Sequence, residues 1–178
     1  MLGMVALLAG CGYTTQSSLD SKYQTVFVSA FQNESREYDL QAPLTNAVRR
    51  MFITDGRLRV VDHKDADLII EGVIQDYRLR GLTYDANDEA TQFLSFVVAS
   101  VRCTDGHTGD VVWEERAMTG ETTYYTQAAG QSSDRLRGNL EVYLPAVRSF
   151  STEEENRSAS EALAQLAMDI FFRTIEPW

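Results

Sequence analysis

The sequence predicts an α+β fold, a two-layer sandwich in which two helices pack on one face of a mainly antiparallel sheet of four to five strands. Two segments, one early and one at the end of the chain, have apolar residues at helical spacing on one side only. Between them lie three long segments rich in β-branched and aromatic residues, separated by turn-forming residues. Helices with a single apolar side are most simply buried against one face of a sheet.

The composition fits one domain of ordinary size. The chain has 178 residues, of which 44% are hydrophobic and 24% are charged, values typical of a globular protein with one core. Its formal net charge is −10, so the broad positive surface that nucleic-acid binding requires is missing. We therefore expect no nucleic-acid partner.

The N-terminus predicts an export signal and a lipid anchor. Residues 1–10 are apolar or small and carry no charged side chain, as in a secretory signal peptide; because no basic residue precedes the apolar stretch, we interpret the signal as shortened at its start. The order LAGC at residues 8–11 resembles the lipobox of bacterial lipoproteins, in which the cysteine is acylated and becomes the first mature residue. This motif predicts lipidation of Cys11, followed by a small, polar tether over residues 11–22. The alternative is an ordinary buried segment with a core cysteine.

The first part of the expected single domain, residues 23–178, contains a strand, a helix and a short strand. Residues 22–31 are rich in β-branched and aromatic side chains and predict a strand. From Leu40, apolar residues recur at spacings of three and four, which predicts a helix that stops at Gly56. RLRVVD, at residues 57–62, predicts a short strand.

The middle of the domain predicts an antiparallel meander. GLTYDANDEATQ, at residues 81–92, predicts a polar connection between the first two strands, and DGHTGD supplies the second turn. Gly72 predicts a bulge or a close backbone approach. The three long strands are expected at residues 66–80, 93–104 and 111–123.

The chain ends with a predicted amphipathic helix. Ser151 and Glu154 are three residues apart, as in a capping box at a helix start. The helix ends before Pro177. Residues 124–150, which precede it, have weak periodicity and match no motif. The apolar stripe of this C-terminal helix contains Ala162, Leu163, Leu166, Ala167, Ile170 and Phe171.

These segments together resemble the lipopolysaccharide-assembly lipoprotein family, LptE. The likeness rests on GCGY, TVFVSAFQNES, LTNAVRRMFITDGRLRVVD running into ADLIIEGVIQDYRL, the turn TGDVVWEE and the final helix. The resemblance implies a lipoprotein at the periplasmic side of the outer membrane, with no enzymatic activity and no cofactor besides the covalent lipid. It also implies an LptD-type outer-membrane β-barrel as partner. The lipoprotein would assist assembly of that barrel and act as its plug during lipopolysaccharide transport.

A second interpretation is an envelope lipoprotein that regulates a cell-wall synthase or a secretion pore through protein–protein binding. Such domains also begin with a strand, an F-x-N stretch and a helix leading into a strand, which residues 31–62 partly imitate. The long strands directly after DADL and the lack of further strand–helix units favour the LptE-like interpretation. A periplasmic enzyme is a third possibility, but the sequence has no nucleophile elbow or glycine-rich phosphate loop.

Arginine pairs are the candidate ligand-binding residues. Two residues apart on a strand share one face, so Arg78 and Arg80 would present paired guanidinium groups suited to phosphate. We expect Arg78, Arg80 and Arg102 to contribute to a lipopolysaccharide-contacting face, although no family motif fixes these positions. The alternative is that they neutralise neighbouring carboxylates. The triplet Arg-Leu-Arg occurs at residues 57–59, 78–80 and 135–137.

We expect no metal site. Cys103 and His107 lie on either side of a turn, and His63 has no neighbouring ligand type in the sequence. DANDE, at residues 85–89, imitates the opening of a calcium loop but lacks the glycine and distal glutamate of such loops. Cys103 lies at the end of an apolar strand, so we expect its thiol to be buried.

Overall fold

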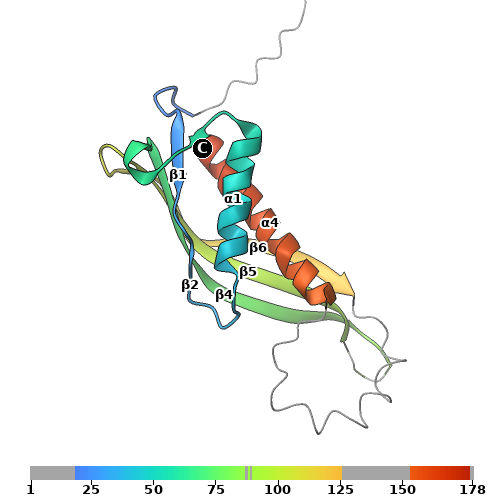
Figure 1. Cartoon of the computed structure of the whole chain (residues 1–178). Helices are drawn as coiled ribbons and strands as arrows, with labels where there is room; N and C mark the ends of the chain where they lie inside the picture. The colour runs from blue at the N-terminus through green and yellow to red at the C-terminus, as the bar shows by residue number, and fades with distance from the viewer. Residues whose placement is uncertain (1–18, 87, 89, 126–152, 177–178) are drawn as a thin grey trace, which may run out of the picture.

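The chain folds into one sheet with two long helices on the same face (Figure 1). The computed structural model describes residues 19–86, 88, 90–125 and 153–176. The helices are α1 (Gln41–Asp55) and α4 (Glu153–Ile175), and a short 3₁₀ turn, η1, covers His63–Asp65. The strands are β1 (Thr25–Val28), β2 (Gln32–Asn33), β3 (Arg59–Val60), β4 (Leu68–Tyr84), β5 (Ala90–Asp105) and β6 (Val111–Tyr125).

The sheet is mixed and six-stranded, so the expectation of a mainly antiparallel sheet with four to five strands was wrong. Its order is β3-β1-β4-β5-β6, with β2 also beside β4. β1 runs parallel to β3 and β4, and β2 runs parallel to β4. The physical reason is that α1 carries the chain back between β1 and β3, and such a crossover returns the next strand in the same direction. The meander β4-β5-β6 is antiparallel, as predicted.

β4 and β5 are longer than the sequence pattern indicated. Residues 81–92 were expected to be a polar connection, yet the ladder continues through them as far as the pair Tyr84 and Ala90. This outer part of the hairpin is held by main-chain pairing although its side chains are largely exposed. Polar composition therefore marked surface exposure here and not the end of the strands.

Two glycines act as the sequence predicted. Gly56 closes α1 in the left-handed conformation, with φ 77°, and its N–H bonds to the Phe52 carbonyl 3.0 Å away. Gly72 lies directly against the Phe31 ring, so a Cβ at this position would overlap the ring. Gly72 therefore allows the close approach, while the nearest register shift of β4 against β5 falls between Ile74 and Asp76.

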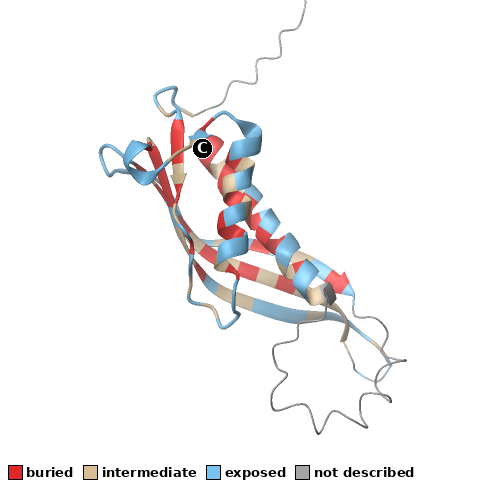
Figure 2. Cartoon of the chain, in the orientation of Figure 1, coloured by how far each residue is buried: buried red, intermediate tan, exposed pale blue. Residues whose placement is uncertain are grey.

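The core lies between the helices and the sheet (Figure 2). Leu44, Val48 and Phe52 of α1 are fully buried, and the Phe52 and Phe171 rings meet edge to face at 5.2 Å between centroids. The predicted stripe of α4 is confirmed, because all six of its residues are buried. Ser151 lies outside the described residues. The sheet face opposite the helices has no helix against it within the described part of the chain.

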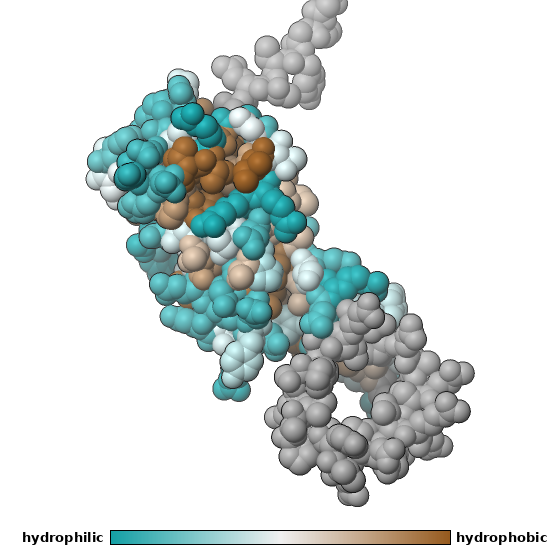
Figure 3. All heavy atoms as spheres, in the orientation of Figure 1, coloured by the Kyte–Doolittle hydropathy of each residue, from teal (hydrophilic) through white to brown (hydrophobic). Residues whose placement is uncertain are grey.

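Figure 3 shows the helix side of the molecule, whose surface is mostly hydrophilic. Hydrophobic surface gathers near the C-terminal end of α1. Ile53 on α1 is 66% exposed and Phe172 on α4 is 47% exposed, and both lie in the last turn of their helices.

Candidate functional site

An apolar stripe runs along β5 on the sheet face that the helices leave free. Ser95, Val97 and Ala99 are buried on the helix side, so the alternating residues Leu94, Phe96 and Val98 face the other way and are half-buried. Strands that are apolar on both faces are usually covered on both faces. This face is thus the best-supported binding surface of the described residues, and the apolar run at residues 93–99 was the sequence signal for it.

Arg78 and Arg80 border this stripe, as the sequence predicted for residues that share a strand face. Together with Phe96, Val98 and Thr119 they line a hollow of about 710 Å³. The Arg80 guanidinium lies 5.8 Å from the centre of the Phe96 ring, within cation–π range. Arg78 is mostly exposed, and its Nε donates to an Asp76 carboxylate oxygen. The hollow therefore combines an apolar floor with two cationic groups.

Arg102 shares the same face but not the same hollow. Glu71 and Arg102 are paired across β4 and β5, whereas Arg78 is paired with Phe96. Arg102 lies six positions after Phe96 on β5, about 20 Å along a strand. Arg102 donates from Nη2 to Glu114 Oε1 at 3.1 Å and lines a smaller hollow of about 270 Å³. The structure thus brings two of the three predicted arginines together, while Arg78 and Arg102 each also pair with a neighbouring carboxylate, as the alternative expected.

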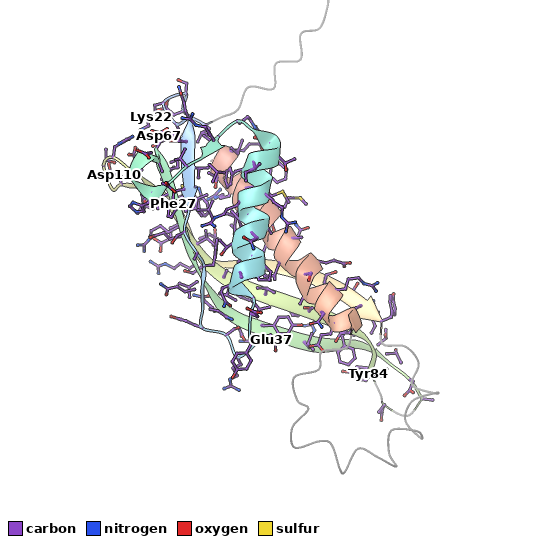
Figure 4. All side chains as sticks on the ribbon, in the orientation of Figure 1. Lys22, Phe27, Glu37, Asp67, Tyr84 and Asp110 are labelled. Atoms are coloured by element: carbon purple, nitrogen blue, oxygen red, sulfur yellow. The ribbon has the colours of Figure 1, made fainter. Side chains whose placement is uncertain are left out.

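A polar cluster fixes the point where the chain enters the domain, at the end of the sheet where Figure 4 labels Lys22, Asp67 and Asp110. Tyr23 donates its hydroxyl to Asp105 Oδ2 at 3.1 Å, and Lys22 Nζ is 3.4 Å from the same oxygen. The backbone N–H groups of His107 and Thr108 bond to Asp105 and lower its pKa to about 2. The start of the domain is therefore tied to the turn between β5 and β6.

Asp67 ties the start of β1 to the same end of the sheet. The backbone N–H groups of Gln24 and Thr25 both donate to Asp67 Oδ2 at 2.9 Å. His107 Nε2 lies 3.0 Å from Asp67 Oδ1. These bonds, led by the Gln24 N–H and the His107 ring, hold the pKa of Asp67 well below its usual range. Sequence reasoning missed this cluster because Asp67 lies at least 40 residues from each of these partners in the chain.

A polar contact links the start of α4 to β4 at the opposite end of the domain. The Tyr77 hydroxyl is 3.5 Å from Glu155 Oε1. Burial raises the pKa of Tyr77 to about 12, and burial together with the charge of Glu37 raises the pKa of Glu155. The Tyr77 hydroxyl donates to the Glu155 carboxyl group and by itself lowers the Glu155 pKa, so this hydrogen bond is stronger when Glu155 is ionised and offsets part of the cost of burying its charge.

The remaining sequence candidates that lie within the described residues do not come together as a reactive or metal-binding group. The Cys103 thiol is buried, which raises its pKa to about 12, so it is a poor nucleophile. The His63 ring packs against Phe27. Among the described residues there is no group of three or more His, Cys, Asp or Glu side chains that could hold a metal ion. Cys11, Asn87 and Glu89 lie outside the described residues.

No helix within the described ranges is long and apolar enough to cross a membrane. Residues 23–174 match the family model described as LptE, lipopolysaccharide-assembly. The chain belongs to the LptE family. As a member it is a lipopolysaccharide-assembly lipoprotein, in a family without enzymatic activity.

Two solved structures of bacterial proteins are similar to this LptE family member. A protein from Xanthomonas campestris has 12% identity and a TM-score of 0.50, with 91% of this chain and 92% of that chain covered. A minor lipoprotein from Acinetobacter baumannii has 14% identity and a TM-score of 0.47, with 85% and 90% covered. At 12% identity, the likeness to the Xanthomonas campestris protein concerns the fold alone. Comparison with curated proteins gave no match.

Proposed function

We propose that this LptE family member is an outer-membrane lipoprotein that binds an LptD-type β-barrel, assists its assembly and acts as its plug during lipopolysaccharide transport. Residues 1–10 would be the signal peptide, acylated Cys11 the anchor at the periplasmic side, and residues 11–22 the tether to a single domain over residues 23–178. The family match supports the partner, and the LAGC motif supports the anchor.

The observation that carries the ligand part of the proposal is the hollow beside Arg78 and Arg80. Lipopolysaccharide joins phosphate groups to acyl chains, and this hollow joins guanidinium groups to the apolar residues Phe96 and Val98. Guanidinium groups bind phosphate through paired hydrogen bonds. Arg102 would provide a separate contact further along the same face, suited to a ligand long enough to reach both hollows.

Co-purification of the native lipidated chain in mild detergent tests the partner. The expected result is a complex with a large outer-membrane barrel. Recovery of a cell-wall synthase or a secretion pore in its place would support the alternative regulator and overturn the proposal. Mass spectrometry of the same sample tests the anchor, because an uncleaved chain with an unmodified Cys11 would remove it.

Lipopolysaccharide binding by the purified protein tests the hollow. Arg78→Glu combined with Arg80→Glu should weaken binding strongly, because the apolar stripe would then be bordered by repelling charges. Arg50→Glu combined with Arg157→Glu, two exposed changes on α1 and α4, is the matched control for net charge. Adding Arg102→Glu to the double variant measures the separate contact. Equal binding by the triple variant and the unchanged protein would rule out this face.

A further inference from the structure

The two edges of the sheet differ in how well they are closed. At one edge β3 has only two residues, and beyond it Arg49 donates to the Val28 carbonyl of β1, with Nε and Nη2 at 3.2 and 2.7 Å. At the other edge β6 extends over 15 residues and pairs, among the described residues, only with β5. Short strands and covered main-chain groups prevent an edge from pairing with another strand. Beyond Ile74, β4 also pairs only with β5 among the described residues, but register shifts interrupt that part of its ladder. Within the described part of the chain, β6 is therefore the long strand whose outer side stays unpaired along its whole length.

Protection of β6 is confined to its first half. The register of β6 against β5 shifts between Ala99 and Val101 and again between Cys103 and Thr104, and irregularities of this kind twist an edge away from partners. Three successive charged residues, Glu114 to Arg116, lie in the same half. From Met118 to Tyr125 the strand pairs with β5 one residue for one, with no shift. This half has no proline and no lysine, and its only charged residue is Glu121.

The helix above β6 does not close this edge. α4 covers β6 from the helix side, where the Ala162 carbonyl lies directly against Gly120. Figure 1 shows β6 at the border of the sheet, with its end emerging beyond α4. The main-chain groups along the outer side of residues 118–125 therefore point away from the sheet, over about 25 Å at the usual rise of a strand.

We infer that the second half of β6, residues 118–125, adds an extended segment of the barrel partner as a further antiparallel or parallel strand. This inference rests on the proposed function, because it names the surface through which that partner is held. The strands that form the wall of a closed barrel have no free edge. The added segment must therefore be a loop or a terminal segment of the partner that is not part of that wall. Main-chain hydrogen bonds would supply most of the affinity.

The side chains indicate the chemistry of that segment. On the helix-free face Arg78, Phe96 and Glu121 are direct neighbours across β4, β5 and β6. Opposite charges on neighbouring strands stabilise a pair and like charges oppose it. The position that would follow Glu121 in this row therefore fits lysine or arginine. Exposed Thr119 and Thr123 lie on the same face and fit β-branched partners on either side of it.

Adjacent proline substitutions test the inference in the full lipidated chain. Along β6 successive N–H groups point alternately toward β5 and toward the open edge. Of the two variants Thr122→Pro and Thr123→Pro, one therefore removes an N–H that bonds to β5, and this variant should have a lower Tm. The other removes only an outward N–H, which an edge strand tolerates. We expect that second variant to keep its Tm and to retain about tenfold less barrel on co-purification. Thr122→Ala and Thr123→Ala control for loss of the side chains.

A charge reversal gives an independent readout. Glu121→Lys should lower barrel recovery by about two- to fivefold, whereas Glu115→Lys, an exposed reversal in the irregular half, should not. A photo-crosslinking residue at position 119 should label an extended segment of the barrel, and one at Arg59 on the opposite edge should not. Wild-type recovery with both prolines, or crosslinking of position 119 to this chain's own residues 126–152, would overturn the inference alone. Absence of a barrel from the unchanged protein would overturn the proposed function as well.

Discussion

Gly120 of β6 lies directly beneath the Ala162 carbonyl of α4, so close that a Cβ on the glycine would overlap the carbonyl oxygen and crowd Leu166. This contact sets the distance between the second helix and the edge strand of the sheet. Because helix backbone cannot move as a flexible side chain does, the position admits only glycine without a shift of α4.

Gly120→Ala should therefore lower the free energy of unfolding by about 1–3 kcal/mol, the range for an overpacked core. Urea unfolding followed by circular dichroism measures the change. Thr119→Ala, at the exposed neighbouring position, is the control and should stay within about 0.5 kcal/mol of the unchanged protein. A Gly120→Ala variant as stable as the control would show that α4 does not rest on β6.

Phe52 is fully buried where the two helices meet, in edge-to-face contact with Phe171. Phe52→Ala should cost about 3–5 kcal/mol through lost burial and the cavity left behind. Ile53→Ala, one position further on the exposed side of α1, should change stability little. Similar losses at both positions in a thermal unfolding experiment would contradict the helix orientation.

Stability should fall in acid through the cluster at the start of the domain. Hydrogen bonds from backbone N–H groups lower the pKa of Asp105 to about 2 in the folded chain, compared with about 3.9 for an ordinary aspartate. Because the Asp105 pKa is lower in the folded chain than in the unfolded chain, its ionisation stabilises the folded state at pH values above the unfolded-state pKa. This contribution is lost as the pH falls from about 4 to 2.

Urea midpoints measured between pH 5 and pH 2 test this dependence. Asp105→Asn should be less stable than the unchanged chain at pH 5, and the difference should shrink toward pH 2. Asp110→Asn, an exposed change in the same turn, serves as the control. A difference that stays constant across this range would mean that the Asp105 charge is not the stabilising group.

The Cys103 thiol should be inert in the folded protein, because burial both shields it and raises its pKa to about 12. With Cys11 replaced by serine, a maleimide reagent at pH 7.5 should label the folded chain slowly and the chain in 6 M guanidinium rapidly. Rapid labelling of the folded chain would place the thiol at an accessible surface.

Local pattern was sufficient for most elements. The spacing of Leu44, Val48 and Phe52 predicted α1, Gly56 predicted its end, and the apolar stripe predicted α4, because a helix repeats its faces at a fixed interval. The meander was predicted because turn residues separate its strands. The outer part of the β4–β5 hairpin was missed, since its polar side chains hide a ladder held by main-chain bonds.

The candidate site was predicted less completely. Arg78 and Arg80 lie together, as predicted, because residues two apart on one strand share a face. The position of Arg102 relative to them depends on how β4 and β5 pair, which the sequence does not reveal. The register sets Arg102 opposite Glu71 and leaves it far from Phe96. The Asp67 and Asp105 clusters were missed because their partners come from distant segments.

The sequence by itself determined the helices, the long strands and the resemblance to the LptE family, all of which depend on residues near one another in the chain. Only the tertiary structure decided the parallel pairing of β1 with β3 and β4, the separation of the two arginine hollows, and the open edge of β6. The physical reason is that periodicity reports which side of an element is buried, while strand direction and register depend on which elements meet once the chain has folded.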